Sequence, residues 1–219
     1  MKNVTHEADF CVIGGGMAGI AAALSSSRVM ATCALLGQAV GTAAAQMIRD
    51  GETPDTLSVE NLQNTLMADD CYLPGKARRV SPLSRRLTCS AEVVRNGRER
   101  GDENKWSGKA GDTLLYSSDT PFALSGIRLV FDSDLNRSYQ NMPCCIHLHE
   151  ERFKLPATLI RDFDIVLTDP AGHTETHAFR NVHDRLFTCD LHGTCTSVRF
   201  VPLATRGADT FFVFSFEVL

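Results

Sequence analysis

A glycine-rich segment directly after the first apolar run has the composition of a phosphate-binding turn. Residues 8–13, ADFCVI, are expected to form a short buried strand that ends at Ile13, and a helix-like run continues to Leu24. The pattern GxGxxG is met by Gly14, Gly15, Gly16, Met17, Ala18 and Gly19. Between a strand and a helix, the first glycine permits a tight turn, the second admits a pyrophosphate and the third allows the helix to pack closely. The sequence predicts a dinucleotide-binding βα unit, with a turn that binds no ligand as the alternative.

The acidic residue that completes such a site is missing. An Asp or Glu about 20 residues further on normally binds the ribose hydroxyls. No acidic residue occurs between Asp9 and Asp50, and Gln38 takes that place if residues 29–36 form the second strand. Before residue 76 there is room for at most two βαβ units of roughly 30 residues. We therefore expect a truncated dinucleotide-binding segment.

Two groups of cysteine and histidine have the ligand types of a zinc site. Cys145, His147 and His149 alternate, so on a strand they would share one face. Cys189, His192 and Cys195 form a second group. Neither group has CxxC spacing. Buried thiols and partly exposed histidines are the favoured interpretation, and no metal is predicted.

Three other features each allow a functional and a structural interpretation. Asp132, Asp134 and Asn136 alternate after an apolar run and offer oxygen ligands for Ca²⁺, or they form a turn with Asx hydrogen bonds. Trp106 is either a stacking platform for a sugar ring or a core residue. A cluster of basic residues consists of Arg78, Arg79, Arg85 and Arg86. We interpret this cluster as a solvated linker.

The elements that would position these residues fall into two regions. Residues 28–49 are rich in helix formers and stop at Asp50-Gly51, and residues 60–67 have the pattern of a second helix. After residue 76, short apolar runs alternate with turns, as in an antiparallel sandwich. Those runs are 122–134, 144–150, 162–172, 197–203 and 209–219. The prediction is an α+β chain, with a truncated βα dinucleotide-binding remnant in 1–76 and an antiparallel β-sandwich of the jelly-roll, galactose-binding-like type in 77–219.

Composition narrows the classes of function. The 219 residues are 43% apolar and 22% charged, which excludes wholesale disorder. A net charge of −4 gives no general electrostatic reason to bind nucleic acid or an anionic membrane. Glu7 and Asp9 precede the first apolar stretch, so no signal peptide is predicted, and we expect a cytoplasmic protein with reduced thiols. Polar residues such as Gln38 and Gln46 interrupt residues 29–48, which favours a buried or cofactor-facing helix over a membrane span.

Several segments resemble one family over most of the chain. Residues 9–24, DFCVIGGGMAGIAAAL, resemble the N-terminus of FAD-dependent oxidoreductases of the glutathione-reductase-like class. Residues 28–48, RVMATCALLGQAVGTAAAQMI, are similar to the closing helix of one bacterial subfamily, and residues 62–75 to its continuation. The C-terminal half of this chain resembles the discoidin-like β-sandwich that is appended to the proteins of that subfamily. The resemblance lies at Trp106, 127–137, 181–186 and 197–208.

The resemblance implies an FAD cofactor. Its binding residues would run from Ile13 through the turn Gly14–Gly19, with Arg28, Val29 and Met30 near the flavin. No catalytic residue is assigned, and the substrate would be an unidentified small molecule. The fold of the appended sandwich also suggests a glycan as a partner.

The middle of the family's cofactor domain is missing, because Arg28 follows Leu24 within four residues. In the family, that middle carries the ribose-binding acid, most flavin contacts and the substrate domain. We interpret the chain as an internally deleted FAD-dependent oxidoreductase that is catalytically impaired. The alternative is a non-catalytic β-sandwich module that binds a glycan or a protein. Helix 28–48 would lose the sheet that covers it, which predicts either packing within the chain or self-association.

Overall fold

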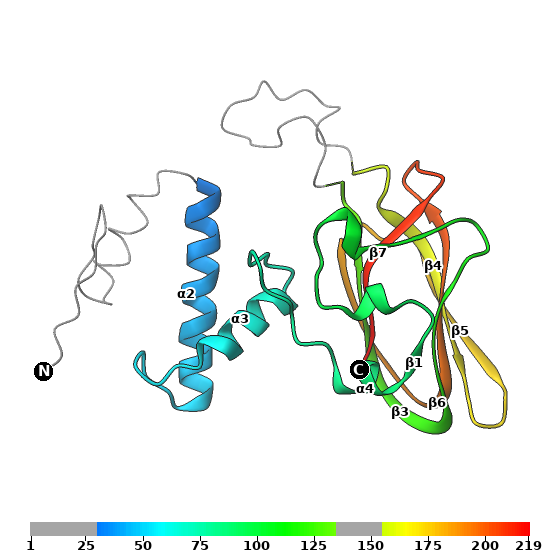
Figure 1. Cartoon of the computed structure of the whole chain (residues 1–219), viewed down its shortest axis with the longest axis horizontal. Coiled ribbons are helices and arrows are strands. Elements are labelled where there is room, and N and C mark those ends of the chain that lie inside the picture. The colour runs from blue at the N-terminus through cyan, green and yellow to red at the C-terminus, as the bar shows by residue number, and fades with distance from the viewer. Residues whose placement is uncertain (1–29, 135–154) are drawn as a thin grey trace, which may run out of the picture. The chain divides into compact units, whose positions relative to one another are not determined.

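Helices come before strands in the part of the chain that the structure describes. The structure is a computed structural model, and it describes residues 30–134 and 155–219 (Figure 1). The chain divides into two compact units, Met1–Leu66 and Met67–Leu219. We call the second unit the β-domain. The turn Gly14–Gly19, Ile13, Arg28 and Val29 lie outside the described residues, and so does the group Cys145, His147 and His149.

The sequence predicts two helices, and the N-terminal unit contains the first and most of the second. Helix α2 spans Met30–Asp50 and ends at Gly51, whose φ of +67° is the left-handed conformation favoured after a helix. Helix α3 spans Val59–Ala68, and the Asn61 amide donates to the Ser58 hydroxyl at 3.3 Å at its start. Because α2 begins at Met30, residues 30–36 are helical, so the condition under which Gln38 would follow a second strand is not met.

Large apolar side chains of α2 are solvent-exposed in this structure. Ile48 is 85% exposed and Leu35 is 54% exposed. Self-association through helix 28–48 remains a prediction that this exposure motivates. Among the described residues, no helix has the length and apolar character needed to cross a membrane.

The β-domain is an antiparallel β-sandwich, as the sequence predicts. Every strand pairing within the described residues is antiparallel, in the order β2-β7-β3-β6-β4-β5, with β1 beside β3. The strands are β1 (Thr88–Cys89), β2 (Trp106–Gly108), β3 (Leu114–Phe131), β4 (Ile160–Thr168), β5 (Thr174–Phe179), β6 (Leu186–Thr205) and β7 (Phe211–Val218). Short helical turns lie between the first strands, namely α4 (Pro82–Arg86), η1 (Glu92–Arg95) and η2 (Asp102–Asn104). The finer assignment to a galactose-binding-like jelly roll stays a prediction.

Two long strands, β3 and β6, take part in both layers of the sandwich (Figure 1). Residues 127–131 of β3 pair with β7, whereas residues 197–205 of β6 pair with β4. Their ladder is irregular between Leu124 and Gly126. A Cβ atom on Gly126 would lie 2.9 Å from the Cys189 carbonyl oxygen, so the backbones approach too closely there for a side chain.

Aromatic rings fill the space between the two layers. The Tyr116 ring meets the Phe216 ring edge-on at 5.2 Å, and the Tyr116 hydroxyl donates to the Phe216 carbonyl at 2.8 Å. The rings of Phe131 and Phe163 also meet edge-on, at 5.4 Å. These rings pack with buried aliphatic side chains such as Ile127 and Leu129 in one core cluster.

Strand β7 departs from the half-buried pattern expected of residues 209–219. Its inward residues, such as Val213 and Phe216, are buried, but Ser215 and Glu217 are buried as well. The opposite side of the strand is therefore covered, and Glu217, at 0% exposure, lies under that cover. A fully buried carboxylate needs charged or polar partners.

Candidate functional site

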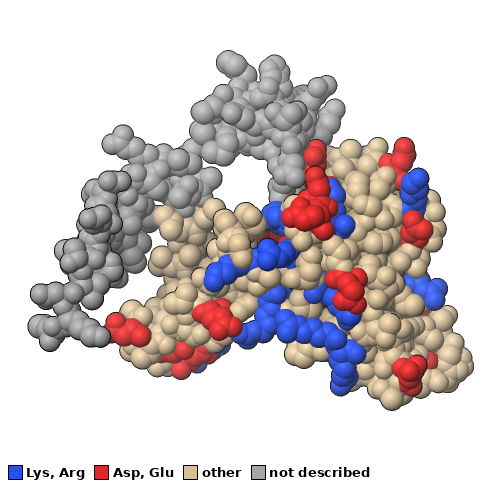
Figure 2. Space-filling model, viewed as in Figure 1, with Lys and Arg blue, Asp and Glu red and all other residues tan. Residues whose placement is uncertain are grey.

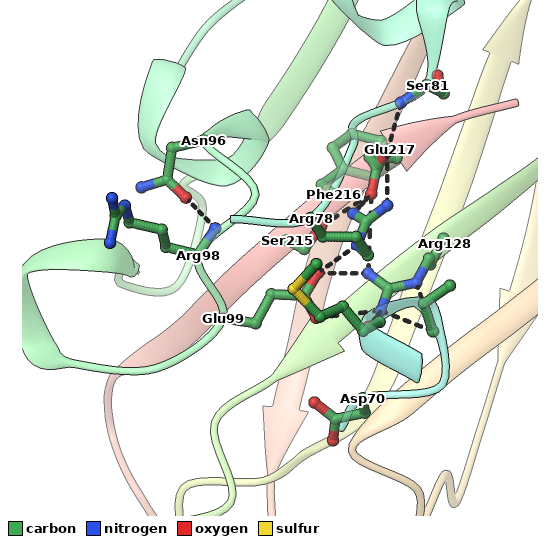
Figure 3. A network of polar contacts seen from close by, with 12 residues as sticks. Asp70, Arg78, Ser81, Asn96, Arg98, Glu99, Arg128, Ser215, Phe216 and Glu217 are labelled. Carbon is green, nitrogen blue, oxygen red and sulfur yellow. Dashed lines mark hydrogen bonds and ion pairs between the residues drawn. The ribbon is translucent and has the colours of Figure 1, made fainter. Parts of the chain in front are cut away.

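Glu217 is held by the segment that precedes α4 (Figure 3). Its carboxylate accepts a very short hydrogen bond from Arg78 Nη2 and a second, of 2.8 Å, from the Ser81 amide. The Ser81 and Ser84 hydroxyls both donate to the Val218 carbonyl, at 2.6 Å and 3.0 Å. These contacts fix residues 78–84 against β7.

Glu99 links the same arginine to strand β3 (Figure 3). It accepts from Arg78 Nε at 3.2 Å and from both terminal nitrogens of Arg128, at 2.5 Å and 3.0 Å. Arg128 also donates at 3.0 Å to the Ala68 carbonyl, at the C-terminal end of α3. A planar guanidinium can donate hydrogen bonds to a carboxylate and to a carbonyl at the same time. Arg128 on β3 therefore joins three segments of the β-domain, which are β3 itself, the loop at Glu99 and the chain at Ala68.

A second branch of the network is centred on Asp70. Its carboxylate oxygens bind Arg100 and Arg185, each at 2.9 Å. Arg185 also donates to the carbonyls of Glu99, at 2.5 Å, and of Phe131, at 2.7 Å. The backbone of Glu99 therefore connects the two branches.

The charges of this network do not balance. Four guanidinium groups face three carboxylates, and the members are Arg78, Arg100, Arg128, Arg185, Asp70, Glu99 and Glu217. Burial lowers the pKa of Arg78, and the nearby charge of Arg128 lowers it further. Burial is also the main cause of the lowered pKa of Arg185. Arginine nevertheless keeps its proton in proteins, so the network carries an excess positive charge.

That excess is local. Figure 2 shows blue basic and red acidic side chains interspersed over the visible face of the β-domain, with neither sign forming a continuous surface. The whole chain has a net charge of −4. The network is therefore positively charged, whereas the net charge of the whole chain is negative.

A cavity of about 140 Å³ opens next to the network. Two loops line it, one at residues 70–76 and one at residues 97–104. The loops are held together where the Arg78 amide donates to the Gly97 carbonyl at 2.8 Å. Gly97 has a φ of +75°, and a Cβ atom there would lie 2.3 Å from the Arg78 carbonyl oxygen, so only glycine fits this approach. We call this space the Tyr72 cavity.

The lining of the Tyr72 cavity combines an aromatic ring with planar polar groups. Tyr72 is 57% exposed, and the Arg100 guanidinium lies 5.9 Å from the centre of its ring. Asp70, Glu103 and Asn104 also line the cavity. Asn104 donates to the Glu103 carboxylate and to the Arg100 carbonyl, both at 2.8 Å, which holds these groups in place. Such a surface presents several hydrogen-bonding groups beside an exposed ring.

The basic cluster expected to be a solvated linker is split by the structure. Arg79, Arg85 and Arg86 are exposed, but Arg78 is only 8% exposed and belongs to the network. The interpretation was therefore wrong for Arg78. The signal in the sequence was Glu217, a charged residue inside the apolar strand FFVFSFEV, which required a buried partner.

The other candidate residues of the β-domain have structural roles. Trp106 packs against the core, with its ring over Gly108. The Asp134 amide donates to the Asp132 carboxylate at 3.1 Å, as expected of an Asx turn, and Asn136 lies outside the described residues.

The group Cys189, His192 and Cys195 does not form a metal site in the structure. Cys195 is buried and His192 is exposed, and both border a separate hollow of about 220 Å³. Burial raises the pKa of the Cys195 thiol, which disfavours the thiolate that binds zinc. Within residues 30–134 and 155–219, no three metal-ligating side chains converge.

Comparison with known proteins gives one family match and several structural likenesses. Residues 23–66 match the model of a family described as FAD dependent oxidoreductase. The match includes Arg28, Val29 and Met30 but not the turn Gly14–Gly19. No curated protein sequence matches the chain. Of the residues that the resemblance assigns to FAD, only Met30, at the start of α2, lies within the described part of the chain.

The structural likenesses concern the sandwich. A family 32 carbohydrate-binding module from Streptococcus pneumoniae EndoD is 13% identical, with 58% of this chain and 83% of that chain covered and a TM-score of 0.44. A module from Clostridium perfringens, in complex with GalNAc-β-1,3-galactose, is 10% identical over 61% and 94% of the two chains, with a TM-score of 0.41. The lectin binding domain of lectinolysin, complexed with Lewis b, is 11% identical over 64% and 96%, with a TM-score of 0.45. At these TM-scores, none of the likenesses identifies a ligand or an activity for the present chain.

Proposed function

We propose that the β-domain is a non-catalytic module that binds a glycan in the Tyr72 cavity. The observation that carries this proposal is the exposed Tyr72 ring beside fixed planar polar groups, Arg100, Asp70 and Asn104. A sugar ring has an apolar face that packs on an aromatic side chain and hydroxyls that pair with carboxylate, amide and guanidinium groups. The cavity is smaller than the clefts of roughly 300–1,000 Å³ that enclose drug-sized ligands, so it suits one or two sugar rings of a longer glycan.

The network supports this role by making the cavity rigid. Asp70, Glu99 and Arg100 line the cavity and are all held in ion pairs, those of Glu99 with the buried Arg78 and Arg128. A site whose polar groups are held in place before binding loses less entropy when the ligand arrives.

Binding is tested with the full-length chain on a glycan array, followed by titration of the glycans that bind. Replacing Tyr72 with alanine is expected to weaken their affinity by about tenfold, because truncation of a central aromatic contact costs more than about 1 kcal/mol. The control is Tyr72→Phe, which keeps the ring and should retain most of the affinity. Equal binding by Tyr72→Ala and the unchanged chain would show that the glycan binds elsewhere.

The second candidate function is FAD binding by the N-terminal unit, in a chain derived from an FAD-dependent oxidoreductase. The match of residues 23–66 to that family favours it. The phosphate-binding turn Gly14–Gly19 would hold the pyrophosphate, and Arg28, Val29 and Met30 would lie near the flavin. Without a ribose-binding acid, we expect such a chain to be catalytically impaired.

This second candidate predicts flavin absorbance that stays with the full-length chain through gel filtration after incubation with FAD. Gly16→Val is expected to abolish the retained absorbance, because a side chain there blocks the approach of the pyrophosphate. A matched control is Gly37→Ala on α2, where an added Cβ atom meets nothing within 4 Å. A colourless unchanged chain, or equal retention by Gly16→Val, contradicts FAD binding at this turn.

A further inference from the structure

The charge around the Tyr72 cavity indicates which glycans it takes. Resting on the proposed function, we propose that the cavity selects sugars that carry a carboxylate, because unpaired Lys76 and Arg98 line it beside a network with excess guanidinium charge. Both residues line the cavity and are exposed. Neither forms an ion pair with any residue that the structure describes.

Two of the carboxylates next to the cavity are already occupied by arginines. Asp70 is shared by Arg100 and Arg185. Glu99 is shared in the same way by Arg78 and Arg128. Neither carboxylate is therefore available to neutralise a further cation at the cavity wall.

Arg98 is not used by the network either. Figure 3 shows its side chain directed away from Arg78 and Glu99, while its backbone amide donates to the Asn96 carboxamide at 2.7 Å. This bond and the Arg78–Gly97 pairing fix the backbone that carries Arg98. A guanidinium on a fixed backbone, with no acidic partner in the described chain, is suited to bind a carboxylate in bidentate fashion.

Glu103 is the lining carboxylate that pairs with no described cation, and it accepts a hydrogen bond from Asn104 at 2.8 Å. It can accept hydrogen bonds from sugar hydroxyls, which donate to carboxylates. The lining therefore offers cations for an acidic group and an acceptor for hydroxyls. A uronic acid carries both kinds of group on one ring.

The test compares pairs of oligosaccharides that differ only in the C6 carboxylate, galacturonate with galactose and glucuronate with glucose. Calorimetric titration of the full-length chain is expected to give about tenfold tighter binding for the acidic member of at least one pair. The preference should shrink between about 50 mM and about 500 mM NaCl, because the two cations are exposed to solvent.

The double variant Lys76→Gln/Arg98→Gln is expected to remove the preference, so that it binds the acidic and the neutral sugar of a pair with equal affinity. The matched control is Lys109→Gln/Arg86→Gln, which removes the same two charge types at exposed positions outside the cavity. Equal affinity for acidic and neutral sugars, or equal loss in the control, overturns the charge selectivity but leaves glycan binding standing. If no glycan of either kind binds the unchanged chain, the proposed function itself fails.

Discussion

Replacing Glu217 with glutamine is expected to lower the free energy of unfolding of the β-domain by about 3–5 kcal/mol. The Glu217 side chain is 1% exposed and is bound by Arg78 and the Ser81 amide. Arg128 lies 3.7 Å away as a further ion-pair partner. Neutralising Glu217 leaves four guanidinium groups against two carboxylates, and two of those groups, Arg78 and Arg128, are buried. An uncompensated buried charge costs far more than a lost surface pair.

Chemical denaturation monitored by tryptophan fluorescence measures this loss. Trp106 is the single tryptophan of the chain and lies on β2, which pairs with β7, so its signal reports on the β-domain. The control is Asp102→Asn, which removes the carboxylate of an ion pair with Lys105 at a position 77% exposed. An exposed pair of this kind is worth about 0–1 kcal/mol. Losses of equal size in the two variants would mean that the network is not the source of the stability.

The elements of the fold could be predicted because each has a local signal. The stop at Asp50-Gly51 and the run of helix formers before it gave the end of α2 within one residue. Apolar runs bounded by turns gave β4 and β7 and the second parts of β3 and β6, but not the first parts of those two long strands and not β5. These signals depend on side-chain periodicity and turn residues within about ten positions, which a single sequence displays directly.

The network could not be predicted in the same way, because its partners are far apart in the chain. Arg78 and Glu217 are separated by 139 positions, and Arg78 lies in a basic stretch that has the composition of a linker. A buried arginine and a solvated one have the same local sequence, and only the partner distinguishes them. The position of Glu217 in an apolar strand indicated that this carboxylate has a charged partner. It did not indicate which cation is that partner.

The Tyr72 cavity was missed for a related reason. Its loops, residues 70–76 and 97–104, have ordinary polar and glycine-rich sequences. They become one site because Gly97 allows the backbone to approach Arg78 and because Asp70 is tied to Arg185 and Glu99 to Arg128 of β3. The sequence pointed instead to Gly14–Gly19, where a local motif exists and where binding remains a prediction.

The largest loss from a single apolar substitution is expected at Phe163 on β4. Its ring is fully buried and lies 5.1–5.4 Å from four other rings, those of Phe131, Phe179, Phe187 and Phe200. Phe163→Ala removes a ring that both layers of the sandwich contact and leaves a cavity between them. Because antiparallel ladders hold the strands on both sides, the cavity cannot collapse fully, and we expect a loss of about 3–5 kcal/mol in the free energy of unfolding.

Two further substitutions make this expectation specific. Phe163→Leu keeps much of the buried volume, so its cost should be well below that of Phe163→Ala. Leu203→Ala on β6 removes a side chain that is 46% exposed, and substitutions at such surface positions usually change stability by less than about 0.5 kcal/mol. Denaturation curves of the three variants therefore rank the sites by burial. If Phe163→Ala costs no more than Leu203→Ala, the aromatic cluster does not join the two layers, and the stability of the sandwich must come from its ladders and from the network around Glu217.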